Sequence, residues 1–319
     1  MTSSVAVVGA GPAGLMAATA AARAGAVVHL FDEGATPGGQ LLYRAQIVTI
    51  GSGEVAERPA DLLRRLLSEA TAAGVELHLG AAVVGCFAGN ELLVIENGTA
   101  SHLTPDILIV TTGSTDLPYP FPGATLPGVF SARALQILMH QLRVRPGRRF
   151  AVIGANAGAE ELAIDIALAG GEVVWSGIAP PQLLSAEGAP GVQCLIVGQA
   201  RYDVDIVVIA VGRQPDSALA TMAGVPIGFT PALGGLVPVV DNQMRSPVPQ
   251  LLIAGDAAGT GSIAAALAEG HLAGMSAAGL LGLASEDEIA AARIAGGPGL
   301  AARFAMRAIL PAKFAQPYA

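Results

Sequence analysis

Cysteine is nearly absent from this chain of 319 residues, which holds only Cys86 and Cys194. The two lie far apart in the sequence and form no C-x-x-C pair. A redox-active dithiol, a zinc knuckle and a cysteine-ligated iron–sulfur cluster within this chain are therefore excluded. Both thiols stand in apolar runs, where we expect them to be buried and inert. Any redox chemistry of the chain must use an organic cofactor.

Charge is also scarce, since 13% of the residues are charged and 4% are aromatic, whereas 52% are hydrophobic. The net charge of −8, with no block of Lys and Arg, argues against a surface that follows phosphates, so we expect no nucleic acid partner. The 41 glycines follow no G-X-Y period, and the apolar content is too high for disorder. Length and apolar content together predict two compact domains.

The best candidate for a membrane span, residues 262–284, has the roughly 20 residues that a bilayer requires. Glu269 and His271 stand near its middle, and Ala and Gly supply much of it. This composition favours a helix packed closely on a sheet. The N-terminus shows no basic segment ahead of its apolar stretch, so no signal peptide is expected. We expect a cytoplasmic protein with no integral membrane association.

Two copies of one strand–helix–strand unit are predicted. In the first, residues 5–9 form a strand, 15–24 an alanine-rich helix, and 26–31 a strand that ends at Asp32 and Glu33. The second copy has its strand, helix and strand at 151–154, 157–169 and 172–175. The chain is therefore predicted to be an α/β protein with two Rossmann-like dinucleotide-binding domains, the second inserted into a discontinuous first.

The first turn carries Gly9-Ala10-Gly11-Pro12-Ala13-Gly14, which matches G-x-G-x-x-G between a strand and a helix. Gly9 allows the turn, Gly11 lets the backbone approach a pyrophosphate, and Gly14 lets helix and strand pack closely. The helix N-terminus attracts the anion. Asp32 or its neighbour Glu33 is placed to accept hydrogen bonds from a ribose diol. The pattern predicts a dinucleotide site.

Two further motifs extend this site to a flavin. Gly38 and Gly39 bring the backbone close to a flat or charged group, and Gln40 offers both a donor and an acceptor. Gly255-Asp256 ends a buried strand before a helix of small residues. There the carboxylate is placed to bond a polyol, while the helix N-terminus faces a ring carbonyl. Together the motifs predict FAD held along its full length.

These motifs divide the chain. Residues 1–115 and 216–285 are predicted to form the FAD domain, 116–215 an inserted, degenerate NAD(P)-binding-like domain, and 286–319 a basic C-terminal tail. We assign no catalytic residue and no metal ligand, and interpret the five histidines as core or surface residues. The candidate cofactor-binding residues are Gly9, Gly11, Pro12, Ala13, Gly14, Asp32, Glu33, Gly39, Gln40, Val83, Thr112, Gly113, Gly255, Asp256 and Ile263.

The sequence as a whole resembles the flavoproteins with two dinucleotide-binding domains, which include thioredoxin-reductase-like and disulfide-reductase-like enzymes. More narrowly, it resembles the FAD-containing alpha chain of heteromeric amino- and imino-acid dehydrogenases: D-hydroxyproline dehydrogenase, opine oxidase, hydrogen cyanide synthase and the sarcosine oxidase alpha chain. The motifs that carry this narrower resemblance are Asp32-Glu33, Gly38-Gly39-Gln40, Tyr43-Arg44, residues 230–235, 238–241 and 244–249, Gly255-Asp256, and Ala268-Glu269-Gly270.

The resemblance implies a second flavoprotein subunit that takes hydride from the carbon next to the substrate nitrogen, while this chain relays electrons. Longer members of the family continue into a cysteine-rich segment, so a small iron–sulfur subunit is an expected partner. A hydroxyproline- or proline-type substrate is favoured, with opines, sarcosine and glycine left open. The rival interpretation is a stand-alone NAD(P)H-dependent flavoprotein reductase without the redox dithiol, and a non-enzymatic flavin-dependent structural protein is a distant third.

The second glycine motif, at residues 154–159, is degraded. Asn156 stands where the close-approach glycine belongs, and Gly177 stands where an acid for the NAD ribose would lie. Glu161 matches a glutamate that nicotinamide-using relatives carry near the flavin, but with Asp165 at i,i+4 it is more simply interpreted as part of a solvated helix face. We expect a retained scaffold with weak or absent dinucleotide affinity.

From Ile289 onward the chain carries four cationic residues and no acid. These residues are Arg293, Arg303, Arg307 and Lys313. A solvated tail, a segment that docks a partner protein, and a membrane-surface helix are the three interpretations that this pattern allows.

Overall fold

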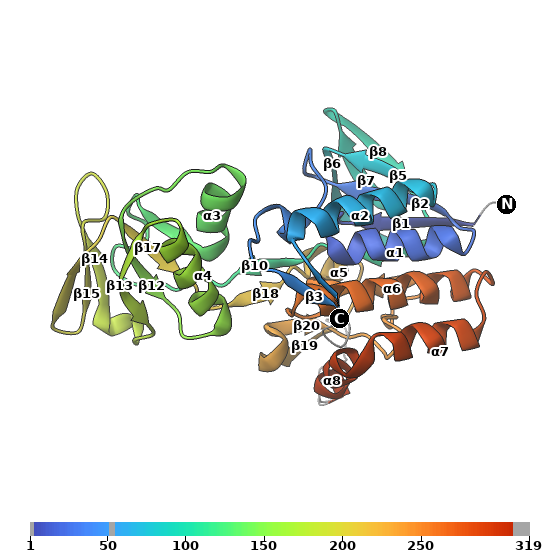
Figure 1. Ribbon diagram of the computed structural model, residues 1–319. Helices are drawn as coiled ribbons and strands as arrows, with labels where there is room; N and C mark the ends of the chain where they lie inside the picture. The colour runs from blue at the N-terminus through green and yellow to red at the C-terminus, as the bar shows by residue number, and fades with distance from the viewer. Residues whose placement is uncertain (1–2, 51–54, 309–319) are drawn as a thin grey trace. The chain divides into compact units, whose positions relative to one another are not determined.

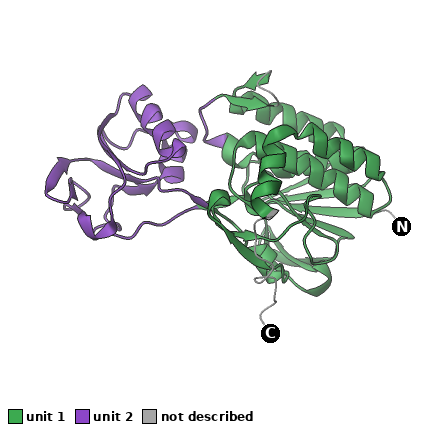
Figure 2. Ribbon diagram, turned by 90° about the horizontal axis from the view of Figure 1, so that it is seen from below, with its two compact units in different colours: residues 1–41, 47–115, 214–319 green, residues 42–46, 116–213 purple. Residues whose placement is uncertain are grey.

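The computed structural model describes residues 3–50 and 55–308, and it divides the chain into two compact units. Figure 2 shows unit 1 in green and unit 2 in purple. Unit 1 lies within residues 1–41, 47–115 and 214–319, and unit 2 is formed by residues 42–46 and 116–213. Two strands that pair with each other, β10 (Ser114–Asp116) and β18 (Arg213–Pro215), carry the chain between the units.

The main sheet of unit 1 has five strands in the order β21-β9-β1-β2-β5, and every pair is parallel. Its strands are β1 (Ser4–Val8), β2 (Val27–Asp32), β5 (Glu76–Leu79), β9 (Ile107–Val110) and β21 (Leu251–Ile253). Because β9 and β1 lie side by side although far apart in sequence, the turns after both strands meet at one edge of the sheet. This edge is where ligands bind in open parallel sheets.

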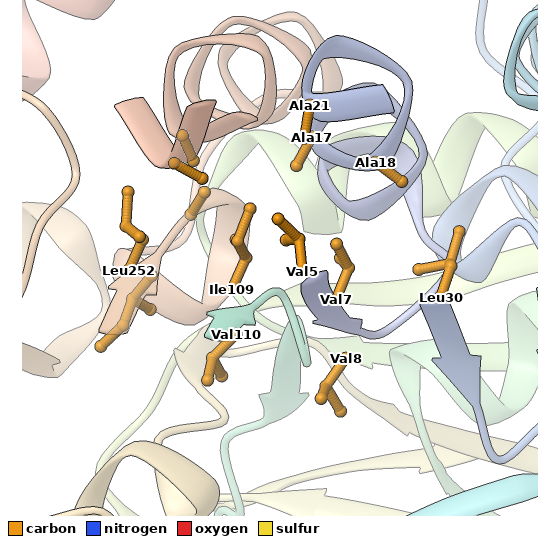
Figure 3. Close-up of a cluster of buried hydrophobic side chains, with 14 of the residues drawn as sticks. Val5, Val7, Val8, Ala17, Ala18, Ala21, Leu30, Ile109, Val110 and Leu252 are labelled. Atoms are coloured by element: carbon orange, nitrogen blue, oxygen red, sulfur yellow. The ribbon is translucent and has the colours of Figure 1, made fainter. Parts of the chain in front are cut away.

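Three helices pack in this unit: α1 (Pro12–Arg23), α2 (Pro59–Ala72) and α6 (Ile263–Leu280). Figure 3 shows Val5, Val7 and Ile109 pointing from the sheet toward the helices, whereas Val8 and Val110 point to the opposite face. This alternation follows from the two-residue period of a strand. All five side chains are buried, so both faces of the central strands are covered.

Small residues let α1 and α6 approach closely, as expected for a helix rich in Ala and Gly (Figure 1). A Cβ atom added at Gly270 would lie 2.2 Å from the carbonyl oxygen of Ala13, so only glycine fits there. Length and composition alone would let α6 cross a membrane, and half of that helix is buried inside the protein.

The remaining elements of unit 1 pack around the five-stranded sheet and its helices. The three-stranded antiparallel sheet β6-β7-β8 contacts β2, and two small hairpins and three further helices complete the unit. These elements are β3 (Val48–Ile50), β4 (Val55–Glu57), β6 (Ala81–Cys86), β7 (Leu92–Glu96), β8 (Thr99–Leu103), β19 (Ile227–Thr230), β20 (Gly235–Pro238), α5 (Ala218–Met222), α7 (Glu286–Ala295) and α8 (Gly297–Ala308).

Residues 286–308 form two packed helices, which contradicts the expectation that residues 286–319 are a separate basic tail. Helices α7 and α8 both contact α6, and Ile289 and Leu300 belong to the main core of unit 1. Ser285 caps α7 with a capping box to Glu288, which fixes where the helix begins. The sequence pattern missed this packing because the apolar stripe of α8 is short. Lys313 lies outside the described residues.

Unit 2 repeats the same plan on a smaller scale. Its parallel sheet has the order β11-β17-β12-β13, and an antiparallel sheet, β14-β15-β16, adds a second layer. The elements are β11 (Val129–Ser131), α3 (Ala132–Gln136), the π-helical turn Ile137–Gln141, β12 (Arg149–Ile153), α4 (Ala157–Leu168), β13 (Glu172–Gly177), β14 (Leu184–Glu187), β15 (Cys194–Val197), β16 (Ala200–Asp203) and β17 (Ile206–Ile209).

Candidate functional site

The turn between β1 and α1 has the shape that a dinucleotide pyrophosphate requires. Gly9 has a φ of +105°, and a Cβ there would lie 2.4 Å from the carbonyl oxygen of Thr111. A Cβ at Gly14 would lie 1.8 Å from the carbonyl oxygen of Gly9, so the third glycine is required for helix and strand to pack. Pro12 occupies the first turn of α1, where its missing N–H costs nothing.

The N-terminus of α1 is available to an anion. Gly11 is its N-cap residue and provides no side-chain hydrogen bond to the first backbone N–H groups. A Cβ at Gly39 would lie 3.1 Å from the Cα atom of Gly11, so the second glycine pair of the sequence comes directly against the first turn. The two motifs that the sequence placed in one site are thus brought together, with Ala13 in the helix that follows.

The two acids at the end of β2, Asp32 and Glu33, have different surroundings. One oxygen of the Asp32 carboxylate accepts the N–H of Ala10 at 2.6 Å, and the other accepts the N–H of Gly34 at 2.8 Å. Asp32 therefore holds the glycine turn and the end of its own strand. Glu33 is the more exposed of the two and lies beside it at the same cavity.

A cavity of about 320 Å³ gathers much of this motif. Among the candidate residues, Gly9, Asp32, Glu33, Gly39, Val83 and Thr112 line it. Phe31, Asp216 and Leu219 also line it, and no sequence motif pointed to them. Asp216 and Leu219 lie far from the glycine motif in the chain, whereas Phe31 looked like an ordinary core residue of its strand. The backbone of Asp216 is held there by the hydroxyl of Thr112, at 2.8 Å, and by the carbonyl of Gly113, at 2.9 Å.

The second polar centre of unit 1 is Asp256, whose residue is 6% exposed. One carboxylate oxygen accepts from Gln40 Nε2 at 2.6 Å and from the Ser114 hydroxyl at 2.9 Å, and the other accepts the N–H of Gly261 at 3.0 Å. Ser114 and Gly261 had no signal in the sequence. Gln40, grouped with Asp256 by the flavin hypothesis, makes direct contact with it.

Buried charged side chains hold the backbone of the loop that contains Asp256. The N–H of Gly255 donates to Glu269 Oε2 at 2.9 Å, and Glu269 is fully buried. Both Arg303 and Arg307 of α8 bind the other oxygen of Glu269, and they also donate to backbone carbonyl oxygens of residues 258–260. Two of the four cations expected in a solvated or docking tail are therefore interior residues, 7% and 5% exposed.

The end of this loop starts helix α6. Ser262 is the N-cap residue, and its hydroxyl accepts the N–H of Ala265. Ile263 follows as the first helical residue. This places the positive end of the α6 dipole beside the loop that Asp256 anchors. Gly255, Asp256 and Ile263 are thus in one contiguous element of the site.

The degenerate motif of unit 2 differs from the motif of unit 1 at the backbone N–H groups that begin the helix. Asn156 is the N-cap residue of α4, and its Oδ1 accepts the N–H of Ala159 at 3.1 Å. Its Nδ2 donates to the carbonyl oxygen of Ala210 at 2.8 Å. A side chain of the protein itself therefore occupies one of the donors that α1 leaves open.

The solvated face expected for Glu161 and Asp165 is wrong for Asp165. That residue is 4% exposed, accepts from Gln46 Nε2 at 2.8 Å and lies 3.1 Å from His140 Nε2. Glu161 pairs with Arg44 at 2.9 Å. The reason is that residues 42–46 belong to unit 2 and contact α4, which no local sequence pattern reveals.

Both cysteines are free and buried, as expected. Burial raises the pKa of the Cys86 thiol, which keeps it protonated and unreactive. Two histidines that had no partner nearby in the sequence have partners from other parts of the fold. His102 lies 2.8 Å from Glu91, and His29 lies near both Glu76 and His78.

The residues of unit 1 fit FAD. An open helix N-terminus suits a pyrophosphate, an exposed acid beside a cavity suits a ribose, and the loop at Asp256 with the α6 N-terminus suits the ribityl chain and flavin ring. The structure also explains why the motif needs glycine, because a Cβ at Gly9 would collide with the backbone of Thr111 and a Cβ at Gly14 with the backbone of Gly9.

Comparison with known proteins agrees with this geometry. The alpha chain of the sarcosine oxidase of Rhizobium meliloti (strain 1021) is 30% identical over 302 residues, which cover 83% of this chain and 29% of that protein. The A chain of the opine oxidase of the same strain is 28% identical over 331 residues, covering 86% of this chain and 71% of that protein. The chain thus spans less than a third of the first relative.

Solved structures show the same fold. The L-proline dehydrogenase from P. horikoshii superimposes with a TM-score of 0.76 at 24% identity, covering 88% of this chain and 56% of that one. The thioredoxin reductase of T. acidophilum gives 0.66 at 22% identity, covering 85% and 96%. The family model described as pyridine nucleotide-disulphide oxidoreductase matches residues 3–184 and 181–270. The chain is an FAD-binding oxidoreductase that belongs to this family, with the resemblance to alpha chains of amine-oxidising enzymes confirmed by its relatives.

Proposed function

We propose that the chain is the FAD-binding alpha chain of a heteromeric, dye-linked amino- or imino-acid dehydrogenase, and that it relays electrons received from a partner flavoprotein. The relatives named as subunits of sarcosine oxidase, opine oxidase and hydrogen cyanide synthase support this proposal. The observation that carries it is the difference between the two helix N-termini. Gly11 leaves that of α1 without a side-chain cap, whereas Asn156 caps that of α4.

In unit 1, this chain's residues have separable roles in the proposed site. The N–H groups at the start of α1 bind the pyrophosphate, and Glu33 accepts hydrogen bonds from the adenosine ribose. Asp256 and Gln40, joined at 2.6 Å, orient the ribityl chain. The N-terminus of α6 would favour negative charge on a flavin ring bound beside it. When bound, FAD supplies a two-electron acceptor.

In unit 2, the corresponding positions do not suit a nicotinamide nucleotide. The Oδ1 atom of Asn156 takes the donor at Ala159, and Gly177 ends β13 where a ribose would need an acid. Glu161, the remaining candidate for a contact near the flavin, has Arg44 as a salt-bridge partner. An electron source other than NADH or NADPH follows, and a partner protein is the source that the relatives' names suggest.

The finer assignments are part of the same proposal. The substrate class is an amino or imino acid, with hydroxyproline or proline first. The partners are a small iron–sulfur protein and a flavoprotein that oxidises the substrate, and the complex is cytoplasmic. The chain has two cysteines, fewer than the four thiolates that ligate a typical iron–sulfur cluster, so a cluster would come from another protein of the complex.

Two measurements test the proposal. The chain alone and the complex purified with its partners are compared for dye-linked oxidation of hydroxyproline, proline and sarcosine. We expect activity only in the complex, and full turnover by the isolated chain would contradict electron relay. In anaerobic stopped-flow mixing, we expect NADH and NADPH to reduce the flavin slowly. Rapid bleaching at micromolar nucleotide would instead favour the stand-alone reductase.

A further inference from the structure

Three side chains with metal-binding atoms converge on two neighbouring strands of unit 1. His29 lies on β2, and Glu76 and His78 lie on the edge strand β5. The parallel register pairs His29 with Glu76, and it pairs Phe31 with His78. Because side chains alternate along a strand, all of these point to the same face of the sheet. The sequence alone did not bring His29 to Glu76 and His78, because the register of two strands far apart in the chain places them opposite one another.

Two separations between their ligand atoms are close to those in a tetrahedral coordination shell. His29 Nδ1 lies 3.2 Å from His78 Nε2 and 3.1 Å from Glu76 Oε2. All three ligand atoms lie within 4.8 Å of one another. Tetrahedral zinc, bound at about 2.0–2.1 Å, sets its ligand atoms roughly 3.3 Å apart.

Hydrogen bonding alone accounts for this arrangement less well. His29 Nδ1 lies at similar distances from Glu76 Oε2 and His78 Nε2. If it donates, its one hydrogen serves one of these two atoms, and if it accepts from His78, the contact with Glu76 has no hydrogen. Both distances exceed the roughly 2.7–2.9 Å of a charge-assisted hydrogen bond. A cation at the centre would use the lone pairs of both imidazoles and of the carboxylate at once.

We propose that His29 Nδ1, His78 Nε2 and the Glu76 carboxylate form a binding site for a divalent transition metal ion, with Zn²⁺ as its occupant. Two imidazoles and one carboxylate suit zinc and disfavour the all-oxygen ions Mg²⁺ and Ca²⁺. Three protein ligands leave a fourth position, and it opens to solvent because the Glu76 side chain is 62% exposed.

The surroundings hold the ligands in place. The ring of His78 stacks on Phe31, with centroids 4.6 Å apart and planes at 17°, which limits its rotation. Phe31 also lines the cavity beside Asp32 and Glu33. The bound ion would join the edge strand β5 to β2 directly behind the wall of the dinucleotide cavity.

The test uses the full FAD-loaded chain without an affinity tag, freed of metal by a chelator. Isothermal titration with Zn²⁺ is expected to show one site per chain, and titration with Mg²⁺ none. His78→Gln and Glu76→Gln are each expected to weaken zinc binding about 100-fold, which is the upper end of the loss caused by changes around metal ligands. The matched control is His102→Gln, because His102 pairs with Glu91 on the surface and joins no such triad among the described residues.

Zinc X-ray absorption supplies a second readout that does not depend on affinity. We expect two imidazole ligands in the wild type and one in His78→Phe, a variant that keeps the ring stacked on Phe31. The proposal is overturned if the wild type binds zinc no more tightly than His78→Gln, if His102→Gln loses binding equally, or if the absorption spectrum contains no imidazole.

Discussion

The Glu269 carboxylate accepts Nη2 of Arg307 at 2.8 Å, although both side chains are almost completely shielded from water. Arg303 binds the same oxygen, so the interior holds two cations and one anion. Burial lowers the pKa of the Arg307 guanidinium, while the neighbouring Glu269 opposes that shift. Helix α8 thereby braces the backbone of the loop that begins at Gly255.

Removal of the Glu269 charge should destabilise the folded protein. Glu269→Gln is expected to lower the free energy of unfolding of unit 1 by about 3–5 kcal/mol, because two buried guanidinium groups lose their counter-charge. Unfolding followed by the fluorescence of released FAD measures this. The control is Glu57→Gln, which breaks an exposed pair with Arg65 and should cost at most about 1 kcal/mol. Equal losses in the two variants would show that the buried cluster is not a brace.

The two acids at the end of β2 are predicted to have different roles, Asp32 in stability and Glu33 in FAD binding. Asp32→Ala should lower the stability of the FAD-free chain by about 1–3 kcal/mol, because two backbone N–H groups lose their acceptor. Glu33→Ala should leave that stability unchanged and weaken FAD binding by about 1.5–3 kcal/mol through lost ribose contacts. Urea unfolding of the apoprotein and FAD titration measure the two effects. The opposite pattern would exchange the roles of Asp32 and Glu33.

Asp256 is predicted to be needed for FAD retention. Asp256→Ala removes the acceptor for Gln40, Ser114 and Gly261, so the loop before α6 loses its anchor. We expect FAD to bind at least about tenfold more weakly, equivalent to about 1.4 kcal/mol or more. Equilibrium dialysis gives the affinity. Asp241→Ala, in a turn stabilised by the same kind of backbone contacts, is the control and should bind FAD as the wild type does.

His271 is predicted to make the protein less stable in mild acid. Burial, with a smaller contribution from Arg23, lowers the pKa of the imidazole in the folded state. The unfolded chain therefore binds a proton first, and the free energy of unfolding should fall as the pH drops below about 6.5. One such group contributes at most about 1.4 kcal/mol per pH unit. Unfolding between pH 7 and 5 should be less pH-dependent in His271→Gln, and an unchanged slope would contradict this.

The backbone of the proposed site could be predicted from the sequence where it depends on contiguous residues. The turn at Gly9–Gly14, its following acids and the loop at Asp256 are local motifs whose backbone requirements leave few alternatives. Their meeting in one unit follows from parallel strand order, which the motif spacing already implied.

What could not be predicted depends on charges that meet across long separations. Arg303 looked like a solvated cation because its partner, Glu269, stands in a different helix. Asp165 looked exposed because its partner Gln46 belongs to a short segment far away in the sequence. The histidines and glutamate that meet across β2 and β5 have the same origin: register, rather than sequence spacing, decides which side chains meet.

The cap that Asn156 places on α4 satisfies, within unit 2 itself, a backbone N–H group of the kind that α1 leaves without a side-chain partner. Saturating nucleotide normally stabilises the domain that binds it, by an amount that grows with concentration. We therefore expect added FAD to raise the melting temperature of unit 1 and to leave that of unit 2 unchanged, so that calorimetry of the chain would resolve two transitions, of which only one shifts with the cofactor.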